Sequence, residues 1–362
     1  MDLEARLKLI GQVGEEILTA EELRHLLETK SHPVAYDGFE PSGRIHIAQG
    51  LLRAINVNTL CEAGIHFKMF VADWHAWANN KMDGNLDHIR TVGEYFIEVW
   101  RMTGMNLDHV EFVWANDLLD DRDYWKTVMQ VARHSTLQRI LRTTQIMGRS
   151  ESDVLQASQI FYPCMQAADI FELGADIAQL GMDQRKVNVL ARELAEKLGR
   201  TKPVAVHHHM LMGLGEPARP PTETGQRPEG PRSASQTLER ATAMKMSKSN
   251  PDSAIFMTDS TVEIARKINK AYCPERRIDE NPILEYNKYI LFQHPRFSSG
   301  LTIERPEKFG GTIHFETYGQ MAQAFAEGAL HPADLKKATA SSIDMLIAPV
   351  RDHFAKNAKA RH

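Results

Sequence analysis

The chain of 362 residues is 43% hydrophobic and 25% charged, which is ordinary for a globular protein of about two domains. Its net charge of −4 argues against a protein that binds polyanions over its whole surface, although a local basic patch stays open. No apolar run reaches membrane-spanning length, and the polar, acidic N-terminus is unlike a signal peptide. Cys61, Cys164 and Cys273 lie far apart, which predicts a reducing compartment and no zinc site. We therefore expect a cytoplasmic protein.

The N-terminal third of the chain predicts helices that alternate with strands. Residues 2–30 have the apolar periodicity of two short helices. The apolar stretch 33–36 predicts a strand that runs into a tight, glycine-containing turn. A helix is expected over 45–63, and further strands are expected over 67–72 and 110–114.

The middle of the chain continues this alternation. Residues 121–174 and 183–199 predict amphipathic helices, and 205–209 predicts a late strand. Strands separated by helical stretches are typical of βαβ units, so we expect an α/β domain with a parallel sheet. The three adjacent histidines in the late strand are interpreted as structural, because neighbouring residues on a strand point to opposite faces and make a poor metal site.

The composition changes at residues 215–243, where five prolines and scattered Gly, Ser and Thr predict a flexible surface insertion. The chain then becomes helical again, with short strands and turns over 300–311. The helices are expected over 259–271, 281–293, 316–327 and 333–357. The expected domains are the N-terminal helices 1–32, an α/β domain 33–255 and a mostly helical domain 256–362.

A first nucleotide motif, His46-Ile-Ala-Gln49, opens the predicted helix directly after the turn Pro41-Ser-Gly43. Free backbone N–H groups and the positive end of the helix dipole favour phosphate at such a position. A histidine here can donate to phosphate oxygens as their negative charge grows. The alternative is a histidine that only supports the turn.

A second motif, Lys245-Met-Ser-Lys-Ser249, follows the proline-rich insertion. Two lysines and two hydroxyls within five residues make a mobile, electropositive clamp. Attack on the α-phosphate of ATP places extra charge on the phosphate oxygens, and lysines carried by a closing loop stabilise that charge. The alternative is a solvated basic loop, but the first motif some 200 residues upstream favours the clamp.

The two motifs resemble the HIGH and KMSKS signatures of class I aminoacyl-tRNA synthetases. This resemblance implies a Rossmann-like catalytic domain, with His46, Gln49, Lys245 and Lys248 as catalytic residues. Ala48 and Gln49 depart from the HIGH pattern: a methyl group crowds the adenine slightly, and glutamine donates a hydrogen bond without carrying a charge. The resemblance implies an ATP site made of Gly38, Glu40, Ser42, Gly43, His46, Gln49, Met246, Ser247, Lys248 and Ser249.

A third constellation lies in a predicted helix. Tyr162, Gln166 and Asp169 occur at i, i+4 and i+7, which places all three on one helix face. With Gly181-Met-Asp-Gln184 downstream, this stretch resembles tyrosyl-tRNA synthetases of the archaeal and eukaryotic type, and the likeness covers about 33–357 apart from the insertion. The alternatives are ordinary helix packing for Tyr162 and Gln166, and a solvated acid or helix cap for Asp169.

That resemblance implies a role for each pocket residue. Tyr36 and Asp169 bind the phenol oxygen of tyrosine, and Tyr162, Gln166 and Gln184 hold its α-amino end. A buried carboxylate is costly without a partner, so a tyrosine hydroxyl satisfies Asp169 where phenylalanine leaves it unpaired. His75 matches a further position that lines the pocket.

The C-terminal region carries an expected anticodon site. By the same resemblance, Phe309 stacks on the first anticodon base, and His331 and Asp334 pair with its edge, which is how single-stranded RNA is usually read. Asp334 also suits a purely structural role, since an acid stabilises the first turn of a helix. The basic residues of the last helix are interpreted either as phosphate contacts or as a solvated face.

The expected reaction has two steps: ATP activates tyrosine as an adenylate, and the terminal ribose of tRNA then takes the tyrosyl group. Magnesium is expected to accompany ATP without a metal site built by the protein. The resemblance implies a homodimer. Three alternatives remain: a tryptophanyl-tRNA synthetase, which has no use for a carboxylate aimed at a phenol; a non-catalytic RNA-binding paralogue; and a small nucleotidyltransferase, which does not need residues 256–362.

Overall fold

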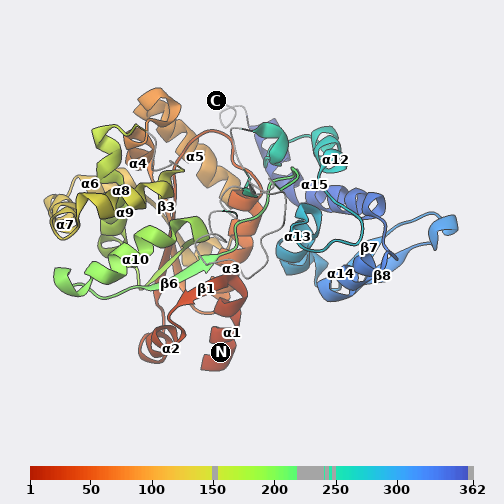
Figure 1. Cartoon of the computed structure of the whole chain (residues 1–362), viewed down its shortest axis with the longest axis horizontal. Helices are drawn as coiled ribbons and strands as arrows, with labels where there is room; N and C mark the ends of the chain where they lie inside the picture. Colours follow the sequence, from red (N-terminus) through yellow and green to blue (C-terminus); the bar gives the residue numbers. More distant parts are fainter. Residues whose placement is uncertain (149–153, 218–239, 241–243, 247–249, 358–362) are drawn as a thin grey trace, which may run out of the picture. The chain divides into compact units, whose positions relative to one another are not determined.

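The computed structural model describes residues 1–148, 154–217, 240, 244–246 and 250–357 (Figure 1). The chain forms two compact units. The N-terminal unit contains Met1–Gly43 and Asn56–His209, and the C-terminal unit contains Arg44–Ile55 and Met210–His362. This division by contacts groups the first nucleotide motif with the C-terminal part of the chain. The functional domains expected from the sequence, 1–32, 33–255 and 256–362, remain a prediction.

The N-terminal unit is built on a six-stranded sheet of order β1-β6-β5-β2-β3-β4. Strands β2 to β6 run parallel to their neighbours, and β1 pairs with β6 in the antiparallel direction. The strands are β1 (Gly14–Leu18), β2 (Val34–Phe39), β3 (His66–Val71), β4 (Val110–Trp114), β5 (Ile177–Gly181) and β6 (Val204–His208).

The strand order reverses between β2 and β5, which pair through Tyr36 and Ala178. Chain order runs outward from β2 through β3 to β4 on one side, and from β5 to β6 on the other. In open parallel sheets a ligand binds at such a switch point, beyond the carboxyl ends of the strands. The expected α/β fold with a mostly parallel sheet is therefore confirmed.

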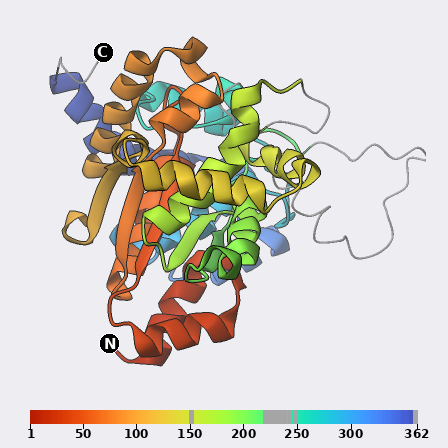
Figure 2. The same ribbon diagram turned by 90° about the vertical axis from the view of Figure 1, so that its left-hand side faces the viewer.

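Helices accompany this sheet, and those between residues 115 and 195 lie across one of its faces (Figure 2). The α-helices are α1 (Leu3–Val13), α2 (Ala20–Thr29), α4 (Asp73–Ala78), α5 (Leu86–Met102), α6 (Ala115–Leu119), α7 (Arg122–Arg133), α8 (Leu137–Thr143), α9 (Ala157–Glu172) and α10 (Arg185–Leu194). Single 3₁₀ turns are η2 (Lys81–Gly84), η3 (Leu107–His109), η4 (Thr144–Met147), η5 (Met182–Gln184) and η6 (Glu196–Leu198). The apolar periodicities that predicted these helices bury one face of each, as in α7 and α10.

Two strands were absent from the expected elements. β1 separates the two N-terminal helices and carries Glu15 and Glu16, so its sequence lacks an apolar alternation. β5 is buried along its whole length although Gln179 interrupts its apolar run. Strands this short are difficult to recognise because their pairing partners, not their own sequence, stabilise them.

The C-terminal unit is mostly helical, as expected, with a small hairpin of β7 (Leu301–Ile303) and β8 (Ile313–Phe315). Its helices are α12 (Thr261–Lys270), α13 (Pro282–Tyr289), α14 (Tyr318–Glu327) and α15 (Pro332–Lys356), with shorter turns η7 (Pro251–Ser253), η8 (Leu291–Gln293), η9 (Pro295–Phe297) and η10 (Glu307–Phe309). α15 packs against both α12 and α13. Among the described residues, no helix is long and apolar enough to cross a membrane.

The helix expected over 45–63 begins differently from its prediction. A single π-helical turn, η1 (Ala48–Leu52), precedes the α-helix α3 (Arg53–Glu62), and the division between the two units falls within α3. π-turns are rare and occur mostly at functional sites. Periodicity alone did not predict this turn, because one extra residue per turn leaves the apolar pattern almost unchanged.

Candidate active site

Helix α9 presents three of the expected pocket residues on one buried face. Tyr162, Gln166 and Asp169 are only 7%, 8% and 1% exposed. The helix packs against α7 and α10, and Tyr36 of β2 belongs to the same hydrophobic cluster as the apolar residues of α9. Burial of an amide and a carboxylate needs polar partners, so the neighbours of these two side chains reveal what the face is built to hold.

Asp169 lies between two donors. The hydroxyl of Tyr124 donates to Asp169 Oδ1 at 2.9 Å, and His75 Nε2 lies 2.8 Å from Oδ2. All three side chains are buried. Each carboxylate oxygen can accept a second hydrogen bond, so Asp169 retains acceptor capacity for a further buried donor.

Charge and burial set the protonation of this cluster. Burial by itself lowers the pKa of His75, but the Asp169 carboxylate outweighs burial and the pKa of His75 is raised. Burial, followed by the negative charge of Asp169, raises the pKa of Tyr124 and of Tyr36 well above the ordinary value. The two phenols therefore stay protonated at neutral pH and act as hydrogen-bond donors.

The raised pKa of His75 predicts a pH-dependent contribution to stability. A histidine whose pKa is higher in the folded than in the unfolded protein stabilises the fold fully below its unfolded pKa of about 6.5, and this is lost as pH rises through the folded pKa. The difference in free energy of unfolding between wild type and His75→Gln is therefore expected to be largest near pH 5.5 and to shrink at higher pH. Urea unfolding at several pH values measures it.

His207 provides the opposite control in the same unit. It is buried against Glu16 and Asn188, and burial lowers the pKa of His207 despite Glu16. Its penalty appears as pH falls, so the difference between wild type and His207→Gln is expected to change with pH in the opposite direction. Parallel pH trends for the two variants would contradict the assignment of His75 as the raised histidine.

The expected amino-end residues meet each other. Gln166 Nε2 donates to Gln184 Oε1 at 3.1 Å, and Gln184 in turn donates to the Ile146 carbonyl. The ring of Tyr162 packs edge-on against His75 with 5.2 Å between centroids. The structure thus brings Tyr162, Gln166, Gln184, His75 and Asp169 together in one unit.

Two buried polar atoms of this group keep unused hydrogen-bonding capacity. Tyr36 faces Gln166, yet within the described part of the chain the Tyr36 hydroxyl and Gln166 Oε1 make no hydrogen bond of ordinary geometry. Buried polar atoms are rarely left in this state without a reason. A ligand with a hydroxyl at one end and an ammonium group at the other suits them both.

Glu40, expected at the ATP site, is held by the loop after α4. Asn79 Nδ2 donates to Glu40 at 2.9 Å, Gln159 Nε2 donates to Asn79, and Lys81 lies 3.6 Å from Glu40. Asn80 is left-handed, with φ 55°. Conformations of this kind are costly for residues with a side chain and concentrate at functional sites.

The other expected ATP residues of this unit lie in the turn after β2. Gly38 ends the strand with the Phe70 ring 3.4 Å from the position that a Cβ would take. Ser42 Oγ donates to the Glu40 carbonyl at 3.2 Å, and Gly43 has φ +92°. The left-handed backbone at Gly43 explains the glycine, because side chains disfavour that region.

The first nucleotide motif belongs to the C-terminal unit. His46 is buried and pairs in a β-bridge with Phe256, while its carbonyl accepts from the N–H groups of Gln49 and Gly50. A Cβ at Gly50 would lie 2.5 Å from Met257 Sδ. The glycine after the motif thus allows the π-turn to pack directly on the segment around Phe256.

The second motif is only partly described. Lys245 forms a β-bridge with Met212, and Met246 N–H donates to the Leu211 carbonyl at 3.2 Å. Ser247, Lys248 and Ser249 lie outside the described residues, as does the expected insertion over 218–239 and 241–243.

The expected anticodon residues lie in the C-terminal unit. Phe309 is 59% exposed in η10, and Lys308 Nζ lies 4.9 Å from its ring centre. Arg305 donates to the carbonyls of Gly311 and Ala329, which ties the Phe309 loop to the chain just before α15. His331 caps α15 by accepting from Ala333 N–H, and Asp334 lies in its first turn.

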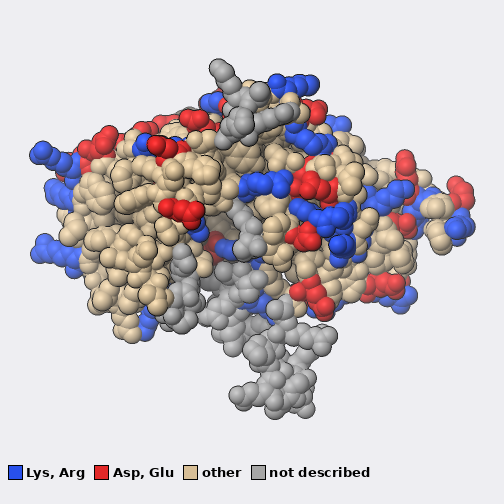
Figure 3. Space-filling view, turned by 90° about the horizontal axis from the view of Figure 1, so that it is seen from above, with Lys and Arg blue, Asp and Glu red and all other residues tan. Residues whose placement is uncertain are grey.

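Several basic residues have structural partners. Arg185 pairs with Glu16 at 2.8 Å, and Lys186 contacts the side chain of Gln145. Arg351 pairs with Asp344 at 2.7 Å. On the face seen in Figure 3, acidic and basic residues are interspersed over the described surface. Recognition of a nucleic acid by this protein therefore has to rest on specific residues more than on a broad electrostatic surface.

Sequence reasoning missed two residues of the pocket. Tyr124 donates to Asp169 from 45 positions away in the sequence, and Asn79 orients Glu40. A buried tyrosine on an amphipathic helix and an asparagine at a helix end are common elsewhere, so neither carried a signal. Only the packing of α7 against α9 and of α4 against α9 brings them to the site.

Known proteins with similar sequences and structures define the family. The family model for class I tRNA synthetases (W and Y) matches residues 28–348. Tyrosine–tRNA ligase 1, cytoplasmic, of Arabidopsis thaliana is 48% identical over 100% of this chain and 87% of its own length. The tyrosine–tRNA ligase of Thermococcus kodakarensis is 43% identical over 99% of this chain and 96% of its own length.

A solved structure agrees with these sequence relatives. The tyrosyl-tRNA synthetase of Pyrococcus horikoshii, complexed with L-tyrosine, superposes with a TM-score of 0.90 at 40% identity, covering 100% of this chain and 98% of that chain. Likeness at this level extends over both units of the fold. The chain therefore belongs to the class I tRNA synthetases of the tryptophan and tyrosine group, and within that group to the tyrosyl-tRNA synthetases.

Proposed function

We propose that the chain is a tyrosine–tRNA ligase, which activates L-tyrosine with ATP and transfers it to tRNA(Tyr), releasing AMP and pyrophosphate. The observation that carries the choice of amino acid is the buried Asp169, which keeps acceptor capacity near the unsatisfied hydroxyl of Tyr36. A phenol hydroxyl completes this group by donating to Asp169 and accepting from Tyr36. An indole ring has no oxygen for Tyr36 to donate to.

In the first step, the protein binds and orients its substrates without forming a covalent bond to them. Tyr162, Gln166 and Gln184 hold the α-ammonium group, which leaves the carboxylate to attack the ATP α-phosphate. His46 donates to phosphate oxygens as their charge grows, and Lys245 and Lys248 supply positive charge from the loop. Gly38, Glu40, Ser42 and Gly43 border the nucleotide. Magnesium enters bound to ATP.

Tyrosine-dependent exchange of labelled pyrophosphate into ATP tests this proposal. Exchange with tyrosine and not with tryptophan supports it, whereas exchange with tryptophan alone contradicts it. Binding of tRNA(Tyr) without any amino-acid-dependent exchange indicates a non-catalytic paralogue. Because exchange does not need tRNA, it isolates the activation step from transfer.

For the second substrate, we propose that Phe309, His331 and Asp334 read the first anticodon base. The exposed ring of Phe309 provides a stacking surface, and Arg305 ties its loop to the turn that carries His331. A carboxylate at Asp334 can accept from both N1–H and N2–H of a guanine.

Replacing Asp334 with Ala is expected to raise KM for tRNA(Tyr) in aminoacylation by about tenfold or more, since a lost base contact costs about 1–3 kcal/mol. Pyrophosphate exchange should stay at the wild-type level. Asp352→Ala, an exposed acid on the same helix, serves as the matched control. Equal effects of both variants on the KM for tRNA would argue against base reading by Asp334.

We also propose a homodimer in the cytoplasm. Large exposed apolar side chains occur on α4, α7, α8 and α9, where α9 packs against the other three. They are Trp77, Trp125, Met129, Leu137, Leu141 and Phe161. Exposed apolar surface of this extent is typical of a protein interface, and the cytoplasmic name of the Arabidopsis relative supports the location.

The double variant Met129→Asp with Leu137→Asp is expected to be monomeric, because charges at the centre of an apolar interface are strongly unfavourable. Light scattering coupled to size-exclusion chromatography measures the mass, which should halve relative to wild type. Val262→Asp, at an exposed apolar residue of α12, is the control and should leave the mass unchanged. A dimer that persists in the double variant places the interface elsewhere.

A further inference from the structure

A short segment after the second nucleotide motif pairs with the first motif. Ile47 N–H donates to the Ile255 carbonyl at 2.9 Å, and Met257 N–H donates to the Ile45 carbonyl at 3.0 Å. His46 is thereby fixed opposite Phe256. The same segment begins at Ala254, only a few residues beyond the Lys-Ser pair that ends the second motif. Any group that shapes this segment therefore acts on the base of both motifs.

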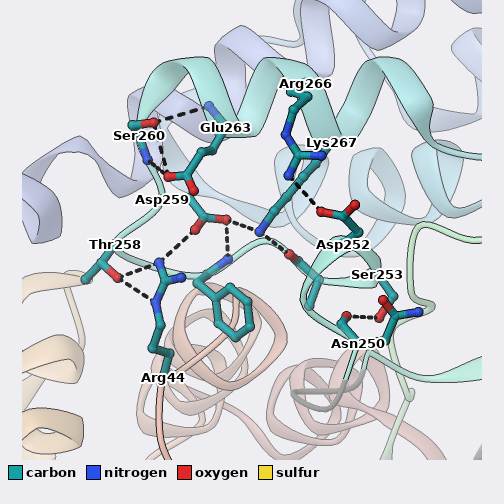
Figure 4. Close-up of polar contacts among 12 residues, drawn as sticks. Arg44, Asn250, Asp252, Ser253, Thr258, Asp259, Ser260, Glu263, Arg266 and Lys267 are labelled. Atoms are coloured by element: carbon teal, nitrogen blue, oxygen red, sulfur yellow. Dashed lines mark hydrogen bonds and ion pairs between the residues drawn. The ribbon is translucent and has the colours of Figure 1, made fainter.

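Asp259 is that group (Figure 4). Its fully buried carboxylate accepts from Phe256 N–H at 3.0 Å, from Lys267 Nζ at 2.6 Å and from Arg44 Nη2 at 2.7 Å. Asp259 N–H donates back to the Phe256 carbonyl, which closes a tight turn. Three donors from three places in the chain thus converge on one acid.

The two basic residues extend these contacts in both directions. Lys267 also donates to the Ala254 carbonyl at 2.8 Å, which anchors the start of the segment. Arg44 also donates to Thr258 and directly precedes Ile45 and His46. The Phe256 ring lies between the cations, with Arg44 Cζ at 4.4 Å and Lys267 Nζ at 4.8 Å from its centre. Cations over the face of an aromatic ring are attracted to it.

Stability alone is a weak explanation for this arrangement. Removing charges from water is so costly that apolar residues of similar volume often stabilise a fold as well as a buried ion pair does. A buried pair with several hydrogen bonds does, however, fix one geometry, because few other arrangements satisfy every polar atom. Here the geometry that is fixed is the position of the His46 backbone relative to the base of the second motif.

We propose that Asp259, acting through Arg44 and Lys267, is a positioning residue for ATP activation. It sets the distance between the His46 turn and the start of the KMSKS loop before ATP binds, and it touches no substrate. The proposal rests on the proposed function, since it refines the ATP half of the same site. It predicts that ATP use, and not tyrosine binding, depends on this buried carboxylate.

The test compares Asp259→Asn with the double variant D259N/K267M and with Thr339→Val. Thr339 accepts a buried hydrogen bond from Asn287 at 2.8 Å in the same unit but contacts neither motif, so T339V controls for loss of stability alone. Pyrophosphate exchange yields KM for ATP and for tyrosine separately, and thermal unfolding is measured alongside. Wild-type exchange is established first, and its absence would overturn the proposed function and not this refinement.

We expect D259N to raise KM for ATP about tenfold and to lower kcat by about 10–100-fold, with KM for tyrosine unchanged, as for a small misplacement of reacting groups. The double variant should recover the unfolding temperature, since no buried charge is left alone, while its KM for ATP stays high. T339V should lower the unfolding temperature without changing KM for ATP. Recovery of KM for ATP together with stability in the double variant would overturn the proposal. If D259N does not fold, the double variant decides the question.

Discussion

Replacing Asp169 with Asn is expected to lower tyrosine-dependent pyrophosphate exchange by about two to four powers of ten. The carboxylate holds His75 at 2.8 Å in a fully buried pair, and removing one partner of such a pair costs about 3–5 kcal/mol. In the same change the phenol of tyrosine loses a charged acceptor, which is stronger than a neutral one.

The specificity of the Asp169 variant should change along with its rate. Tyrosine-specific synthetases themselves reject phenylalanine by about 10⁴–10⁵, a figure known for this class of enzyme and not calculated from the present geometry. The ratio of kcat/KM for tyrosine over phenylalanine should fall sharply in D169N, because the buried group that phenylalanine leaves unsatisfied is weaker. A second variant, Tyr36→Phe, should reduce the same ratio while it keeps the His75 pair intact.

A matched control for Asp169 lies one turn further along α9. Glu172 interacts with Thr127 and Arg200 and not with the pocket residues. Glu172→Gln should therefore leave both exchange and amino-acid selectivity near wild type. If D169N and E172Q lose activity in parallel, the loss reflects damage to the helix, and the role of Asp169 in tyrosine recognition is refuted.

Replacing His46 with Ala is expected to have the second largest effect, a fall of about 10²–10³ in the rate of tyrosyl-adenylate formation. Removing one donor aimed at developing charge has consequences of this size when the donor is held in place beforehand. His46 meets that condition because it is buried and its backbone pairs with Phe256. Single-turnover formation of the adenylate measures the step directly.

Tyrosine binding separates this effect from general damage. The tyrosine residues of the proposed pocket belong to the N-terminal unit, whereas His46 belongs to the C-terminal unit. Equilibrium dialysis with tyrosine alone should therefore give the same dissociation constant for H46A and wild type. His66→Ala, at a half-exposed histidine of β3, should change neither quantity. A weakened affinity for tyrosine in H46A would place His46 in binding and not in the chemical step.

The sequence by itself determined the parts of this protein that depend on neighbours along the chain. The i, i+4, i+7 spacing of Tyr162, Gln166 and Asp169 predicted one inward helix face, and all three are buried on α9. The strands around Tyr36 and after residue 66 follow from apolar runs and turn residues, because such runs are buried from both faces of a parallel sheet. Motif spacing likewise led to the family without any coordinates.

Only the tertiary structure decided which distant residues complete each site. Tyr124 reaches Asp169 because α7 packs on α9, and Arg44 reaches Asp259 across 215 positions. The strand β1 exists because β6 offers it an edge, since its own sequence carries little preference. Periodicity records which face of an element is buried, but not the partner that buries it. Contacts between distant segments therefore fixed the protonation of His75 and the support beneath the ATP motifs.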